Sequence, residues 1–222
     1  MTGRPPLVGV IDSGGPEADL AGGRLFLPDG TWVAARPDRL GHGTAVAEVI
    51  RRALPDARIV HAQVFQDRPV TTAIQVASAL DWLAGRKADV ICLSLGLAAD
   101  RVPLSRAALA AVAAGRIVVA AAPARGGPCY PAAYPGVIAA TGDARCDWDG
   151  LSALEGGVIG AWCGSPEQGG TGQGGASLAA ARVAGHLAAR IAAGARFADG
   201  AAARDALAGA ARFHGPECRG CA

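Results

Sequence analysis

The stretch Leu7-Val-Gly-Val-Ile-Asp12-Ser-Gly sets the frame for the rest of the chain. Its apolar run from Leu7 to Ile11 predicts a short buried strand, and Asp12 follows at the carboxyl end of that strand. Open α/β sheets carry their chemistry at the carboxyl ends of their strands. We therefore expect the strand to deliver the Asp12 carboxylate to a functional edge of a sheet.

Two further segments put a polar residue beside glycine at the start of a helical stretch. Gly-His42-Gly-Thr opens the amphipathic stretch 44–54, so His42 is predicted to stand at a helix N-terminus in a fixed orientation. Gly-Ala-Ser177 opens the small-residue stretch 178–190, which puts Ser177 in the first turn of another helix. Free backbone N–H groups and the positive end of the helix dipole would there face a developing oxyanion.

Each of these residues alone is also typical of an ordinary structural role. An Asp after a strand often caps a turn, a His before a helix often lies on the surface, and a Ser before a helix is most often an N-cap. The order Asp12, His42, Ser177 is more informative, because acid, base and nucleophile follow one another in an order that differs between serine hydrolase folds. Together with Ser94-Leu-Gly after an apolar strand, and with an alanine strand ahead of Tyr130-Pro, these segments resemble the subtilisin-like serine proteases.

The resemblance runs from about Val8 to about Arg190 and implies a catalytic triad. Ser177 would attack the peptide carbonyl, and His42 would take and return the proton. Asp12 would hold the imidazole tautomer and stabilise the imidazolium. The resemblance therefore implies a serine endopeptidase.

The resemblance also implies where a substrate peptide binds. One segment would act as the sheet edge to which the peptide adds as a strand, and a second would form the wall of the main specificity pocket. Proline in place of glycine in that wall narrows the pocket, so we expect a small or modest residue before the scissile bond. The residues of the two segments are Ser94, Leu95 and Gly96, and Ala121, Ala122 and Pro123.

The chain departs from the family pattern where the second oxyanion donor is expected. The family has Gly-Asn after the alanine strand, whereas this chain has Pro123-Ala124, and Ala124 has no donor. Losing one such donor costs roughly a hundred- to a thousandfold in turnover. The Ser177 N–H remains, and we expect a substitute for the second donor. Arg125 and Gln173 are the candidates, although each also fits an ordinary surface residue.

Two other departures concern the nucleophile helix and the size of the chain. Ala181-Arg182 replaces the family's Pro-His, so the first turns of this helix can be regular. About 135 residues separate His42 from Ser177, which is short for the family. The short spacing puts surface loops and their calcium sites in doubt.

Composition and alternation predict one three-layer, doubly wound α/β domain with a mostly parallel sheet. The 222 residues are 51% hydrophobic and 18% charged, which is typical of a globular protein. The core is expected over about 7–190, with a C-terminal helix and a cysteine-containing tail over 191–222. Alternating strands and helices require right-handed crossovers and a mostly parallel sheet. We expect strands at 7–12, 58–65, 90–95, 117–122 and 137–141, and helices at 44–54, 71–84 and 104–114.

The charge pattern and the N-terminal residues bear on the partners and the location of the protein. A net charge of +2 with both signs interspersed offers no field for nucleic acid or an anionic membrane. The first residues show no charged-then-apolar leader, and no apolar run of the sequence reaches membrane-spanning length. If the chain is as synthesised, which Met1 favours, we expect a cytoplasmic protein that folds without a prodomain; if it is a trimmed product, the missing leader indicates nothing.

The six cysteines leave several roles open. Cys92 lies in an apolar strand and is predicted to be a small buried hydrophobic residue. One disulfide could form among Cys129, Cys146 and Cys163. The pair Cys218 and Cys221 has metal-ligand spacing but supplies only two of the four ligands of a structural zinc. We expect no metal and no other cofactor.

The resulting hypothesis is limited proteolysis of a dedicated polypeptide partner, such as removal of a leader or propeptide. A shortened scaffold and a missing oxyanion donor suit a slow, selective maturation protease. The alternative is a pseudoprotease that binds peptides without turnover, which Ala124 favours and the three triad residue types oppose. A nucleotide-binding α/β domain is disfavoured because the phosphate loop and the dinucleotide fingerprint are both missing.

Overall fold

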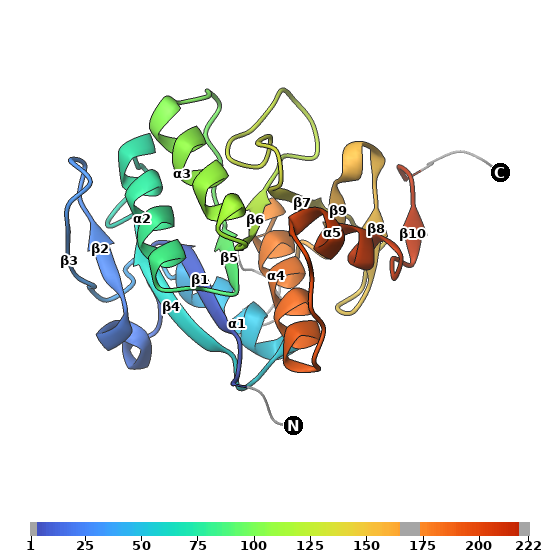
Figure 1. Ribbon diagram of the computed structural model, residues 1–222, viewed down its shortest axis with the longest axis horizontal. Coiled ribbons are helices and arrows are strands. Elements are labelled where there is room, and N and C mark those ends of the chain that lie inside the picture. Colours follow the sequence, from blue (N-terminus) through green and yellow to red (C-terminus); the bar gives the residue numbers. More distant parts are fainter. Residues whose placement is uncertain (1–3, 165–173, 218–222) are drawn as a thin grey trace.

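A ten-stranded sheet organises the computed structural model, which describes residues 4–164 and 174–217 (Figure 1). The strand order is β10-β8-β9-β7-β6-β5-β1-β4-β2-β3. The strands are β1 (Leu7–Asp12), β2 (Arg24–Phe26), β3 (Trp32–Ala34), β4 (Arg58–Gln63), β5 (Val90–Leu93), β6 (Ile117–Ala121), β7 (Ile138–Gly142), β8 (Leu151–Ala153), β9 (Ile159–Ala161) and β10 (Phe213–His214). The helices are α1 (His42–Ala53), α2 (Ala73–Gly85), α3 (Val102–Ala113), α4 (Ala176–Ala192) and α5 (Gly200–Ala208), with 3-10 helices η1 (Glu17–Gly22) and η2 (Glu155–Gly157).

The centre of the sheet is parallel, as predicted. β1 lies between β4 and β5, and the parallel pairing continues through β6, β7 and β9. The antiparallel pairs, β2 with β3 and β8 with β9, lie toward the two edges. All six residues of β1 are buried, as expected for a parallel strand covered on both faces.

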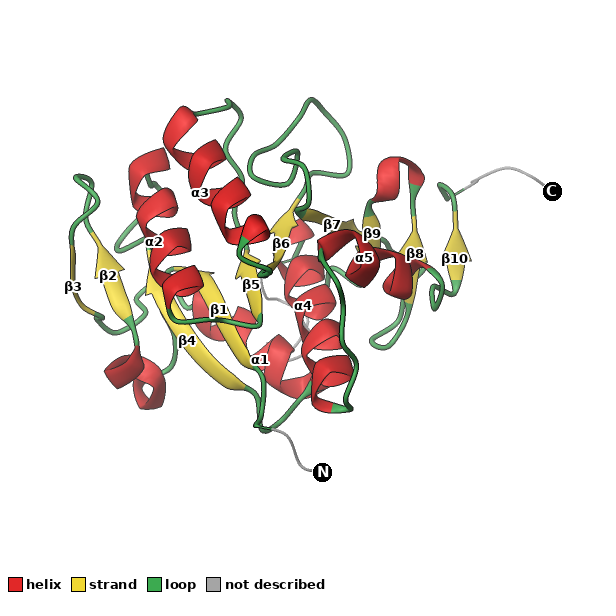
Figure 2. Cartoon of the chain, viewed as in Figure 1, coloured by secondary structure: helices red, strands yellow, loops and turns green. Residues whose placement is uncertain are grey.

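Helices cover both faces of this sheet, which gives three layers (Figure 2). Alternate residues of β1 divide between the two cores: Val8 and Val10 pack with α1 and α4, whereas Leu7 and Ile11 pack with α2 and α3. Side chains along a strand alternate between faces, so Asp12 shares the face of Val8 and Val10. The same alternation that builds the core therefore directs Asp12 toward α1.

The long elements agree with the sequence prediction within a few residues at their ends. Residues 64–65 and 94–95 fall outside strands β4 and β5, and α2 begins at Ala73 because Thr72 forms a capping box with Gln75. The two- and three-residue strands were not predicted, since so short a segment shows no period. The expected C-terminal helix is α5, where Asp199 accepts a hydrogen bond from the Ala202 N–H at 2.8 Å. In the described ranges, no helix is long and apolar enough to cross a membrane.

Candidate active site

Asp12 and His42 form a short hydrogen-bonded pair at the carboxyl end of β1. His42 Nδ1 lies 2.7 Å from Asp12 Oδ2 and 2.8 Å from Oδ1. The Asp12 side chain is fully buried, whereas 22% of the His42 side chain is exposed. Because Nδ1 faces the carboxylate, the other ring nitrogen, Nε2, is left to face a reacting group. The structure thus brings together the two residues predicted as acid and base.

The backbone around Asp12 holds this carboxylate in place. The Ser13 N–H donates to Asp12 Oδ1 at 2.6 Å, and Ser13 Oγ accepts from the Gly43 N–H at 2.9 Å. Gln63 on β4 donates to the Ser13 carbonyl at 2.8 Å. A Cβ on Gly43 would collide with the Gly14 carbonyl, so glycine allows the start of α1 to approach the end of β1 this closely.

Asp38 is a residue of the candidate site that the sequence analysis did not single out. Its Oδ1 accepts from the backbone N–H groups of Leu40 and Gly41, and its Oδ2 accepts from both the N–H and the hydroxyl of Thr44. These bonds satisfy amides at the start of α1, where His42 lies. A carboxylate shortly before Gly-His-Gly-Thr was the available signal, because an acidic residue ahead of a helix is a typical capping pattern.

The charges around His42 raise its pKa above the usual 6.5. Burial acts in the opposite direction, since it disfavours the charged imidazolium. The hydrogen bond and charge of Asp12 outweigh this effect, and the charge of Asp38 adds to them. The site therefore stabilises the imidazolium that forms when His42 accepts a proton.

Ser177 lies in the first turn of α4, as predicted, and its hydroxyl is engaged with β5. Ser177 Oγ donates to the Ser94 carbonyl at 2.9 Å, and Ser94 Oγ donates to the Ser177 carbonyl at 3.4 Å. Within the described part of the chain, no hydrogen bond joins Ser177 to His42. Rotation about the Cα–Cβ bond would be needed to turn the hydroxyl from Ser94 toward an imidazole.

Strand register places the residues that hold Ser177 and His42 at the carboxyl ends of two neighbouring strands. In the parallel pair of β1 and β5, Ile11 is opposite Leu93, so Asp12 and Ser94 follow side by side. Neighbouring strands lie roughly 4.8 Å apart. Asp12 holds His42 and Ser94 holds Ser177, and the two candidate catalytic residues are therefore attached to adjacent strand ends.

The predicted oxyanion region is only half assembled from described residues. The Ser177 N–H belongs to the first turn of α4, where backbone donors have no acceptor in a preceding turn. Ala124 is exposed and lines a cavity of about 470 Å³ together with Cys163. Arg125 is exposed and makes no hydrogen bond or ion pair with a residue of the described ranges, and Gln173 lies outside them. The substitute donor stays a prediction.

The two predicted substrate-binding segments follow the neighbouring strands β5 and β6, and both lie near Cys129. Ser94 and Leu95 are buried, while Gly96 is exposed beyond the end of β5. A Cβ built on Gly96 would collide with Cys129 Sγ and would lie 3.6 Å from the Ala121 carbonyl. The Cys129 side chain therefore lies beside Gly96, and it lines one pocket together with Ala122 and Pro123. Ala122 is half-buried and Pro123 is exposed at the end of the second segment.

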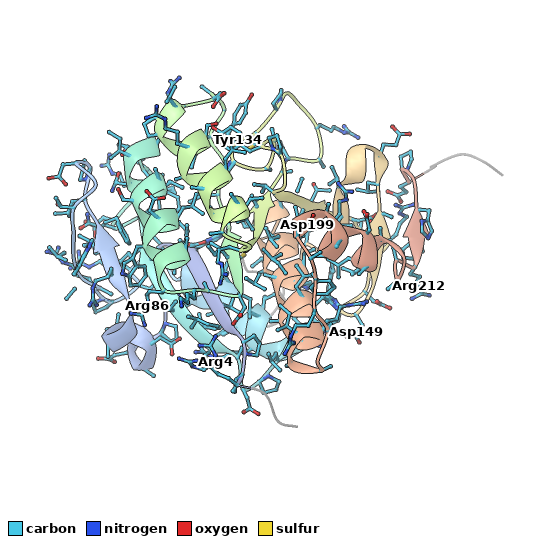
Figure 3. The ribbon with its side chains drawn as sticks, viewed as in Figure 1. Arg4, Arg86, Tyr134, Asp149, Asp199 and Arg212 are labelled. Atoms are coloured by element: carbon cyan, nitrogen blue, oxygen red, sulfur yellow. The ribbon has the colours of Figure 1, made fainter. Side chains whose placement is uncertain are left out.

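The loop that carries Cys129 is fastened on both sides. Leu97 and Tyr130 exchange two backbone hydrogen bonds of 2.7 and 2.8 Å as an isolated antiparallel bridge. Tyr134, which Figure 3 labels near the start of α3, donates its hydroxyl to Asp100 at 2.6 Å. These contacts hold Cys129 against Gly96.

The remaining cysteines form no disulfide among the described residues. Cys92, Cys129, Cys146 and Cys163 are all free thiols, so the bridge considered among the last three is not formed. They lie apart: Cys129 is beside Gly96, Cys163 beside Gly142, and Cys146 near the Gly160 carbonyl. Cys92 is buried, as expected, and burial raises its pKa to about 12. Cys218 and Cys221 lie outside the described ranges, within which no group of three or more His, Cys, Asp or Glu side chains forms a metal site.

Comparison with known proteins gives a family match over more than half of the chain. The model of the Subtilase family matches residues 3–145, a range that includes Asp12 and His42 and ends before Ser177. Subtilisin E of Bacillus subtilis (strain 168) is 30% identical over 157 residues, which cover 62% of this chain and 41% of subtilisin E. The chain spans less than half the length of the curated relatives that it matches.

Solved structures extend the likeness over the whole fold. Sphericase superposes with a TM-score of 0.72 at 22% identity, covering 93% of this chain and 83% of its own. The nisin leader peptidase NisP from Lactococcus lactis superposes with a TM-score of 0.66 at 22% identity, covering 86% of this chain and 78% of its own. At such identities the likeness concerns the fold alone.

Proposed function

The chain belongs to the subtilase family, and on that premise we propose that it is a serine endopeptidase that performs limited proteolysis. The observation that carries the proposal is the hydrogen bond of 2.7 Å between His42 and Asp12 at the end of β1. Ser177 is hydrogen-bonded to Ser94, which follows the neighbouring strand β5. An imidazole backed by a buried carboxylate is a general base, and a serine in the first turn of a helix has backbone donors beside it.

The proposed reaction divides hydrolysis into two acyl transfers. Ser177 Oγ turns from Ser94 to His42 and attacks the peptide carbonyl carbon, while its proton passes to His42 Nε2. The imidazolium, stabilised by Asp12, gives this proton to the leaving amine as the C–N bond breaks. Water then attacks the acyl-enzyme with His42 again as base, which releases the acid product and restores Ser177.

We propose a polypeptide with a removable leader as the substrate. NisP, whose fold this chain shares, is a leader peptidase, and that activity supports the same substrate class here. The chain also resembles, in size and character, the maturation protease that removes the leader from the small subunit of quinohemoprotein amine dehydrogenase. That precursor is one candidate partner. The free thiols of the described cysteines fit a reducing compartment, and we propose the cytoplasm as the place of action.

The substrate residue before the scissile bond is proposed to be small. The Cys129 side chain lies against Gly96, and Pro123 in place of glycine narrows the other wall. A pocket limited in this way accepts glycine, alanine or serine and rejects large aromatic side chains. Such selectivity restricts cleavage to few sites in a folded partner.

The decisive experiment is labelling of the full chain with a fluorophosphonate probe. We expect wild type and the control variant Ser105→Ala to be labelled, and Ser177→Ala to be unlabelled, because Ser177 is the serine that we assign to the base His42. Cleavage of a peptide library should follow the same pattern. Labelling of Ser177→Ala at the wild-type rate would refute the assignment of the nucleophile.

A second candidate function is peptide binding without turnover. It is favoured by the hydrogen bond from Ser177 Oγ to Ser94 and by the missing donor at Ala124. This function predicts that wild type is not labelled by the probe, and that wild type and Ser177→Ala bind the same peptides with equal affinity. The labelling experiment therefore separates the two functions.

A further inference from the structure

Arg182 is a buried cation on the helix that begins with the nucleophile. The residue is 1% exposed, although arginine is rarely buried so completely. Its guanidinium donates to the Trp162 carbonyl through Nη1 and to the Gly164 carbonyl through Nη2, both at 2.7 Å. These two carbonyls belong to the segment 162–164, which leaves β9 and runs past the start of α4.

The surroundings of Arg182 are built to hold a guanidinium. Burying a charge is costly unless it is hydrogen-bonded, and bonds from a charged donor are roughly twice as strong as neutral ones. The guanidinium carbon also lies 4.4 Å from the ring centroid of Trp148 and 5.1 Å from that of Trp162. Indole faces attract cations, most strongly where water is excluded. The planar guanidinium can meet both carbonyls and both rings at once.

The segment that Arg182 holds is bonded to the residue that starts the nucleophile turn. The Cys163 carbonyl, between the two carbonyls bound by Arg182, accepts from the Gly175 N–H at 2.8 Å. Gly175 has a left-handed φ of 116° and caps α4. Its own carbonyl accepts from the N–H groups of Leu178 and Ala179 at 3.2 and 3.3 Å. A displacement of segment 162–164 would therefore move the turn that carries Ser177.

Trp148 also contacts a residue of α1, the helix that begins with the predicted base His42. The guanidinium of Arg52, on α1, lies 3.7 Å from the Trp148 ring centroid. α1 begins at His42, and α4 carries Ser177 in its first turn. One indole therefore contacts both catalytic helices.

We propose that Arg182 is a positioning residue for Ser177, acting through segment 162–164 and Gly175. This inference rests on the proposed endopeptidase function, because positioning is defined by the reaction that Ser177 performs. Arg182 stands where the family pattern has His, so the contacts of its guanidinium are not part of that family pattern. An arginine that merely filled the core would affect stability, whereas a positioning residue affects the rate of the chemical step.

The test compares Arg182→Met with the control Arg190→Met, a matched change on the same helix. Near-attack geometry is sensitive to displacements of about 1 Å, which cost roughly a hundredfold in rate. For folded Arg182→Met, assayed below its melting temperature, we expect kcat and the fluorophosphonate labelling rate to fall about 10- to 100-fold with KM within about twofold. Arg190→Met should match wild type. Wild-type kcat in folded Arg182→Met would overturn the proposal.

A second variant and a second measurement decide the remaining cases. If Arg182→Met does not fold, Arg182→Lys is decisive, because it keeps the charge but lacks the planar fork. Lowered kcat with unchanged KM supports the proposal, and wild-type kcat overturns it. Hydrogen exchange of the Gly175 amide should be faster in the Arg182 variants than in wild type. Unchanged exchange would show that Arg182 does not hold Gly175 through segment 162–164. If wild type cleaves nothing, the proposed function fails, and this exchange measurement alone decides whether Arg182 holds Gly175 in this way.

Discussion

The half of the site that holds the acid and base differs from the half that holds the nucleophile. Asp12 and His42 are joined within 2.8 Å by both carboxylate oxygens, and Ser13 and Asp38 reinforce them from each side. In the other half, Ser177 Oγ is bonded to Ser94, and Ala124 provides no side-chain donor. The first half is complete without a ligand, whereas the second half needs at least a rotation of the Ser177 side chain.

This difference indicates which half of the candidate site a ligand must rearrange. The acid and base are positioned by a buried strand and by helix-capping bonds, which a ligand does not need to change. The nucleophile depends on the turn at Gly175 and on segment 162–164, which lie between β9 and α4. We therefore expect ligand binding to rearrange the nucleophile half, while the candidate acid and base keep their positions.

The largest effect should come from removing the base. His42→Ala should abolish nearly all covalent catalysis, by a factor on the order of a million if this triad behaves as the one in subtilisin itself, from which the figure comes. Because base and nucleophile act as a unit, adding Ser177→Ala should cost little more. Single-turnover peptide cleavage measures this, with circular dichroism to verify folding. Independent, multiplying losses would show that the two halves do not act together.

The next largest effect concerns the missing oxyanion donor. If Arg125 or Gln173 supplies a substitute, its change to alanine should lower kcat by about 100- to 1,000-fold, and Ala124→Asn should add little. This is the outcome that we expect from kcat measured on a short peptide. Unchanged rates in both alanine variants, combined with acceleration by Ala124→Asn, would show that the oxyanion hole lacks a second donor.

A smaller effect should follow from opening the pocket. Cys129→Gly removes the side chain that fills the space beside Gly96, so kcat/KM for peptides with leucine or phenylalanine before the scissile bond should rise about tenfold or more relative to alanine peptides. Ala133→Gly, at an exposed position in the same loop, controls for added backbone freedom. A wild-type profile dominated by large aromatic residues would contradict the proposed pocket.

The smallest effect is a shift of the pH profile. His42 must be neutral to accept a proton, and its raised pKa should place the acid limb of kcat/KM above pH 6.5. Asp38→Asn removes a negative charge that favours the imidazolium, so the acid limb should move to lower pH. Asp67→Asn, at an exposed carboxylate, is the control and should leave the profile unchanged. A shift to higher pH in Asp38→Asn would show that the charge of Asp38 does not act on His42.

The sequence by itself predicted the parallel core and the local setting of each of the three candidate triad residues. The apolar run before Asp12 and the glycines around His42 predicted a strand end and a helix start, because hydrophobic periodicity and glycine act locally. Ser177 was predicted in the first turn of a helix for the same reason. Local signals of this kind can be interpreted without knowing which other elements pack against the segment.

Only the tertiary structure decided what these elements contact. The bond from Ser177 to Ser94 joins residues 83 positions apart, and Arg182 meets carbonyls from another element. Nothing in the pattern around Cys129 showed that its sulfur would meet Gly96, 33 positions earlier. Such contacts depend on strand order and register, which many distant residues determine together. The sequence therefore predicted which residues form the candidate site, and packing determined which groups each of them contacts.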